Sequence, residues 1–142
     1  MKFLKSTLLI FYISNISCAQ KNTPPIETPE KIKYTYETVI EDIDVPWGLD
    51  FINAKEFLLT EKSGKLYKIS NNVKTEITGL PDVYVRGQGG LLDVALHPNF
   101  KQNNIIFLTL SSRIGDSNGG NTALYSAKLN YNTLVNLKLL YK

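Results

Sequence analysis

Apolar and polar residues alternate in short runs from Tyr34 to the end of the sequence, and no stretch repeats with the spacing of a helix. Such alternation is typical of strands that turn one face toward a core. Clusters of glycine, proline and asparagine separate the runs and mark turns. The pattern therefore predicts an all-β chain, with strands at residues 34–40, 47–52, 56–61, 65–70, 73–78, 91–97, 105–111, 122–129 and 134–141.

Eight of these predicted strands form two groups of four with related sequences. The corresponding segments are Leu49-Asp50-Phe51 and Leu92-Asp93-Val94, Leu59-Thr60 and Leu108-Thr109, and Leu66-Tyr67 and Leu124-Tyr125. Two four-stranded units of this length are typical of β-propeller blades, which pack around a ring of about four to eight. A single eight- or nine-stranded sandwich is the alternative fold. Because the order of the four strands repeats, we predict a propeller with blades near residues 45–80 and 88–142.

Two blades cannot close a ring, and each leaves one face uncovered. We therefore expect residues 34–142 to be the N-terminal part of a longer propeller. Residues 34–40 are then a candidate for the strand that closes the ring by pairing with the last blade. The alternative is that the chain is a degenerate remnant, complete as it stands, whose open edges favour aggregation.

The first 19 residues have the order of regions of an export signal. Two lysines precede an apolar core at residues 8–13, which is too short to span a bilayer, and small residues follow. Cys18 stands where a bacterial lipoprotein is lipidated, while cleavage after Ala19 by the ordinary signal peptidase is the competing interpretation. We favour lipidation of Cys18 and predict an exported protein, either periplasmic or attached to the outer membrane or cell surface by this lipid.

Composition narrows the class of protein further. The chain is 43% hydrophobic, enough for a core, and Cys18 is its one cysteine, so the fold stands without disulfides. Without residues 1–19 it has 14 basic and 13 acidic residues, and no basic stripe with aromatics, which excludes nucleic-acid binding. Residues 20–33 contain three prolines and little to bury, which indicates a flexible tether.

The candidate chemistry lies in RGQGGLLDVALHPNF, residues 86–100. In a propeller, the loop that leads into the inner strand of a blade lies at the central channel, where ligands are usually held. The glycines around Gln88 let the backbone approach a ligand closely. The neutral amide of Gln88 can donate to one ligand oxygen and accept from another. A glycine-rich turn whose amide faces water is the alternative.

Other candidate residues favour structural roles. His97 lies past the end of a predicted strand in a His-Pro-Asn turn, so we reject it as the catalytic base. Asp50 and Asp93 occupy matching positions in the two repeats, which favours blade packing over metal binding. Trp47 fits a core or blade interface. The oxygen-rich loop at residues 116–121 lacks the alternation of an EF-hand, which favours a flexible turn over a calcium site.

Taken together, VPWGLDF, LLTEKSGKLYKI, GQGGLLDVALHPNF and NTALYSAKL resemble the soluble PQQ-dependent aldose, glucose and sorbosone dehydrogenases, which are six-bladed propellers. The resemblance runs from Val45 to Lys142. It implies oxidation of an aldose at its anomeric carbon, with PQQ as hydride acceptor, calcium polarising the quinone, and an external electron acceptor. Gln88 matches the family's glutamine that binds substrate at the active-site mouth.

Other family features have no counterpart in this chain. Arg86 has no family match; its charge and reach would let it hold an anionic cofactor, and a solvated loop arginine is the alternative. The family's histidine base, its quinone-binding arginine and lysine, and its calcium site are missing, so we expect no catalytic residue, no metal ligand and no turnover in this chain alone. The alternative function is a non-catalytic surface or periplasmic propeller that binds a protein or glycan partner.

Overall fold

The computed structural model describes residues 32–115 and 119–142. Both sheets belong to one compact unit, residues 36–142. The predicted export signal, Cys18 and most of the tether lie outside the described residues, as does part of the loop at residues 116–121. Among the described helices, none is long and apolar enough to cross a membrane.

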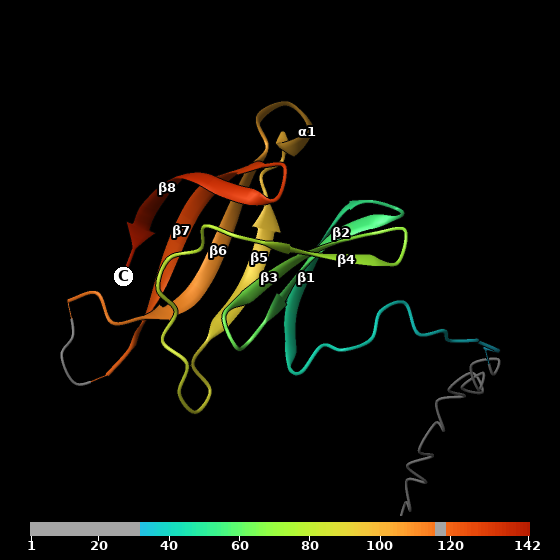
Figure 1. Cartoon of the computed structure of the whole chain (residues 1–142), viewed down its shortest axis with the longest axis horizontal. Coiled ribbons are helices and arrows are strands. Elements are labelled where there is room, and N and C mark those ends of the chain that lie inside the picture. Colours follow the sequence, from blue (N-terminus) through green and yellow to red (C-terminus); the bar gives the residue numbers. More distant parts are fainter. Residues whose placement is uncertain (1–31, 116–118) are drawn as a thin grey trace, which may run out of the picture. The chain divides into compact units, whose positions relative to one another are not determined.

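Residues 46–141 form two four-stranded antiparallel sheets in which each strand pairs with the next along the chain (Figure 1). The first sheet contains β1 (Pro46–Asn53), β2 (Glu56–Glu61), β3 (Lys65–Ser70) and β4 (Val73–Ile77). The second contains β5 (Leu91–Leu96), β6 (Ile105–Ser112), β7 (Asn121–Asn130) and β8 (Thr133–Tyr141). The eight predicted strands from residue 47 onward are therefore present, and their ends differ from the predicted ones by at most one residue.

Local sequence accounts for these hairpins. Along β6, half-buried and buried residues alternate without interruption, as expected for a strand with one face on a core. The turn between β3 and β4 consists of Asn71 and Asn72, with φ of 47° and 64°. Two successive positive φ values are those of a type I′ turn, which asparagine tolerates and which matches the twist of a hairpin.

The two sheets pack against each other through one shared core. Leu58, Leu66 and Ile77 of the first sheet cluster with buried residues of the second, among them Leu91 and Leu108. The Thr60 hydroxyl donates to the Leu92 carbonyl oxygen at 2.5 Å, on the same face of β2 as Leu58. The first strands of the two sheets, β1 and β5, also contact each other, as inner strands of adjacent propeller blades do.

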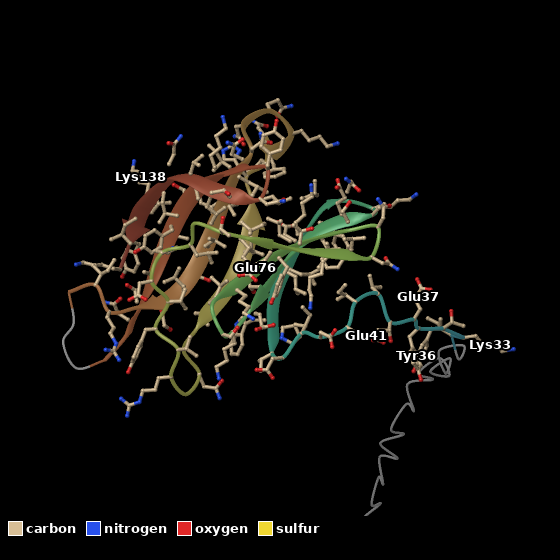
Figure 2. The ribbon with its side chains drawn as sticks, viewed as in Figure 1. Lys33, Tyr36, Glu37, Glu41, Glu76 and Lys138 are labelled. Atoms are coloured by element: carbon tan, nitrogen blue, oxygen red, sulfur yellow. The ribbon has the colours of Figure 1, made fainter. Side chains whose placement is uncertain are left out.

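One sequence prediction about local structure is wrong, and one short element is not predicted by the sequence. Residues 34–40 form no strand; Ile40 and Ile43 instead pack on a small cluster around Leu59, and the chain around Glu37 and Glu41 runs outside both sheets (Figure 2). An alternating sequence of apolar and polar residues forms a strand only where the edge of a sheet is available to pair with it. The one-turn helix α1 (Phe100–Asn103) was not predicted, because it is too short to show helical periodicity.

The predicted equivalence of Asp50 and Asp93 is also wrong. Leu49 lies opposite Leu59, and Val94 lies opposite Leu108, so the ladders align Asp50 with Ala95. Each inner strand contains an extra residue just before Leu49 or Val94, and at each of these points an N–H donates to a threonine hydroxyl of the next strand: Gly48 to Thr60 at 2.8 Å, Asp93 to Thr109 at 3.0 Å. The structural counterpart of Asp93 is therefore Gly48.

Candidate functional site

Gln88 lies on a tight turn just before β5. The Gly89 N–H donates to the Arg86 carbonyl oxygen at 2.8 Å, and Gly87 has φ of +56°. A positive φ at Gly87, with none at Gln88, fits a type II′ turn, which requires glycine at its first central position. The Gln88 side chain stands exposed at the second central position, and no hydrogen bond from another described residue holds it.

Gly90, which follows this turn, lies where the two sheets approach each other closely. A Cβ on Gly90 would lie 2.2 Å from the carbonyl oxygen of Lys62, in the turn between β2 and β3. The Leu91 N–H donates to the same Lys62 oxygen at 3.2 Å, and the Gly90 carbonyl oxygen accepts from the Ser111 N–H at 2.8 Å. The turn that carries Gln88 is therefore anchored to both sheets by backbone hydrogen bonds.

Arg86 lies close to Tyr84 and Arg113. The sequence did not predict that either residue would be part of this site. The Tyr84 N–H donates to the Ser111 carbonyl oxygen at 2.8 Å, which brings the loop before β5 against the end of β6. Arg86 Nη1 donates to the Tyr84 hydroxyl at 3.4 Å and thereby lowers the pKa of that hydroxyl below its ordinary value. The Arg113 guanidinium lies 4.2 Å from the centre of the Tyr84 ring.

His97 lies at the opposite end of β5 from this turn, next to α1 (Figure 1). Its Nδ1 accepts the Asn99 N–H at 3.0 Å and lies 2.9 Å from Asn103 Nδ2, and its ring stacks on Phe107. Because Nδ1 accepts, the ring proton is on Nε2. These contacts fix the turn that links β5 to α1, in agreement with the expected structural role.

Asp50 joins the two inner strands. Its Oδ2 accepts the Leu96 N–H of β5 at 2.7 Å. Asp93 Oδ1 accepts its neighbour Val94 N–H at 2.9 Å and lies 2.2 Å from the place of a Cβ on Gly48, so no larger residue fits there. In residues 32–115 and 119–142, no three histidine, cysteine or acidic side chains gather in a way that would hold a metal ion. Asp50 thus makes a hydrogen bond to β5, and Asp93 packs closely against Gly48 of β1.

We expect Asp50→Ala to lower the free energy of unfolding by about 1–3 kcal/mol, because the half-buried Leu96 N–H loses its acceptor. Asp50→Asn keeps an acceptor oxygen and is expected to lose less than half as much. Urea unfolding of both variants, followed by tryptophan fluorescence, measures the difference. Equal losses in the two variants would show that the hydrogen bond to Leu96 is not what Asp50 contributes.

Trp47 does not have the buried position that the sequence suggested. Its side chain is 45% exposed near the start of β1, among other exposed apolar residues of that strand such as Leu49 and Phe51. Leu49 and Phe51 lie with Leu59 on the face of the first sheet that turns away from the second. A core role for Trp47 within the described residues is excluded by its exposure, while its interface role stays a prediction.

The order of the strands and the contact between β1 and β5 define two adjacent blades of a β-propeller. The turn that carries Gln88 leads into β5, the inner strand of the second blade. The sequence profile of the Glucose / Sorbosone dehydrogenase family matches residues 43–142, and the chain belongs to this family. The predicted all-β propeller fold with two blades is thereby confirmed, and the sandwich alternative is set aside.

Comparison with individual proteins gives the same result. The chain is 35% identical over 96 residues to the aldose sugar dehydrogenase YliI of Escherichia coli, a match that covers 66% of this chain and 26% of that protein. The crystal structure of the soluble aldose sugar dehydrogenase of E. coli in its apo form superposes with a TM-score of 0.68 at 31% identity, covering 74% of this chain and 31% of that one.

A more distant structure shares the fold alone. The PQQ-bound aldose sugar dehydrogenase of Streptomyces coelicolor superposes with a TM-score of 0.65 at 20% identity, covering 74% of this chain and 32% of that one. The chain thus spans about a quarter of the length of the curated relatives it matches and about a third of the solved chains.

Proposed function

We propose that this chain supplies two blades and part of the substrate-binding end of an exported PQQ-dependent dehydrogenase that oxidises aldose sugars at the anomeric carbon. The observation that carries the proposal is the position of Gln88: within the family-matched region, it is exposed on an anchored turn that leads into an inner strand. Bound PQQ would supply a quinone that accepts hydride from the sugar.

The residues of this chain would bind and orient the sugar rather than carry the chemistry. The Gln88 amide would donate to one sugar hydroxyl and accept from another, without a charge to desolvate. Its backbone is fixed by the hydrogen bonds of Gly89, Gly90 and Leu91, so little ordering is needed when the sugar binds. The Arg86 guanidinium offers donors that suit a carboxylate, whether of PQQ or of an acidic sugar. Calcium ligands and the proton acceptor would come from outside the described residues.

Oxidation of aldoses by the protein purified from its own cells tests the proposal. After incubation with PQQ and calcium, we expect reduction of a dye acceptor that depends on an aldose, and none when PQQ is omitted. The intact mass of the same sample would show what length of chain accompanies the activity and whether Cys18 carries a lipid. A protein that binds glycans or a protein partner yet oxidises no aldose would instead support the non-catalytic propeller.

In the active preparation, we expect Gln88→Ala to lower kcat/KM for aldoses about 10- to 100-fold, the equivalent of one or two lost hydrogen bonds to substrate. The substitution is at an exposed position and is expected to leave the unfolding midpoint unchanged. Steady-state kinetics and a urea melt measure the two effects. Lys101→Ala, at the far end of β5, is the control for an exposed substitution, and a Gln88 variant no slower than this control would remove Gln88 from the site.

A further inference from the structure

Tyr84 is held between two arginines close to the turn that carries Gln88. Arg86 Nη1 reaches its hydroxyl at 3.4 Å, and the Arg113 guanidinium stacks on its ring at 4.2 Å. The ring packs closely against Gly120, where an added Cβ would lie 2.3 Å from the Tyr84 Cδ1 atom, and the Tyr84 N–H donates to the Ser111 carbonyl oxygen. The Tyr84 side chain therefore brings two guanidinium groups near each other.

Neither arginine has an acidic partner among the described residues. The ion pair found there joins Lys68 to Glu56, and the side chains of Arg86 and Arg113 are both exposed. Two like charges near one side chain repel each other unless an anion is shared between them. Guanidinium groups with free donors are well suited to carboxylate and phosphate, which they bind with paired, charge-assisted hydrogen bonds.

We propose that Tyr84, Arg86 and Arg113 form an anion-recognition site that binds the carboxylate or phosphate group of a ligand whose hydroxyl-bearing part reaches Gln88. Arg86 and Gln88 belong to the same turn, only two residues apart, so one small ligand can contact both. The preferred ligand class is an acidic sugar, such as a uronate. This identification of the ligand rests on the proposed function, while the anion site itself rests on the arginine geometry alone.

Binding of glucuronate to the 142-residue chain tests the site without any enzyme activity. The arginine Nε–Hε signals of ¹⁵N-labelled protein would be followed by NMR during titration with sodium glucuronate, and with glucose at the same sodium chloride concentration. We expect glucuronate, and not glucose, to shift the signals of Arg86 and Arg113. Arg86→Gln and Arg113→Gln are each expected to weaken binding about tenfold, the loss of a charge-assisted hydrogen bond.

A matched control removes one positive charge elsewhere. Lys101→Gln, in α1 at the other end of β5, is expected to leave glucuronate affinity unchanged. The anion site is excluded if glucuronate shifts neither arginine signal more than glucose does at the same sodium chloride concentration. It is excluded equally if the two arginine variants bind as the Lys101 variant does.

A third titration with PQQ, which also carries carboxylates, distinguishes the source of the anion. PQQ that displaces glucuronate from the same two arginines would assign the site to the cofactor, and PQQ that leaves them unshifted would assign it to the sugar. The outcome is separable from the proposed function. Glucuronate binding with no aldose oxidation by the purified protein would end the dehydrogenase proposal alone, whereas oxidation of neutral aldoses with no arginine response would end the anion site alone.

Discussion

Leu58→Ala is expected to lower the free energy of unfolding by about 2–5 kcal/mol, the usual loss for a leucine truncated in a packed core. The Leu58 side chain is fully buried and belongs to the cluster shared by the two sheets. The cavity would therefore open between the blades rather than within one. We expect a single urea transition at a lower midpoint, because both sheets depend on the same core.

Val73→Ala provides the matched control for Leu58→Ala. Val73 is an apolar strand residue whose side chain is 62% exposed, and its truncation is expected to change stability by less than about 0.5 kcal/mol. Urea unfolding followed by both fluorescence and circular dichroism measures the two variants. Two separate transitions in Leu58→Ala would show that the blades unfold independently, which would contradict a shared core.

Gly90→Ala is expected to destabilise the chain by about 3 kcal/mol and to displace the Gln88 turn, since the new methyl group would overlap the Lys62 carbonyl oxygen. The overlap is with backbone, which cannot rotate away as a side chain can. NMR spectra of the variant are expected to show shifts concentrated in residues 86–91 and around Lys62. The same urea titration gives its stability.

Gly87→Ala separates crowding from backbone strain. No atom lies within 4 Å of a Cβ at Gly87, so its cost comes only from its φ of +56° and is expected to be about 1–2 kcal/mol. If Gly90→Ala proved as mild as Gly87→Ala, the contact between Lys62 and Gly90 would not be what spaces the two blades at this point.

The blade architecture could be predicted because it depends on local sequence patterns. Alternation located the strands, and asparagine and glycine located turns such as Asn71-Asn72. The register of the inner strands could not be read in this way. Extra residues in β1 and β5 shift the ladders, so the two Leu-Asp pairs of the sequence do not occupy equivalent positions in the two blades. A bulge leaves no signature in hydrophobicity, since it changes which residues pair and not which residues are apolar.

The candidate site was predictable only in part, for a similar reason. The motif around Gln88 marked the turn, because glycines flank it in the sequence. The approach of Tyr84 to Arg113 arises from a backbone hydrogen bond between Tyr84 and Ser111, in segments far apart along the chain. No spacing rule links those segments. Residues 34–40 form no strand for a comparable reason. A strand requires a second strand to pair with, and the local sequence does not show whether one is available.

The anchoring of the Gln88 turn also bears on how specificity can change during evolution. Gly90 and Leu91 are tied to Lys62 and Ser111 through backbone atoms, which survive any exchange of the side chains at 62 and 111. The side chains of Arg86, Gln88 and Arg113 take no part in these backbone hydrogen bonds. Under the proposed function, substitutions at these exposed positions are expected to change substrate preference, while the backbone hydrogen bonds that hold the turn stay in place.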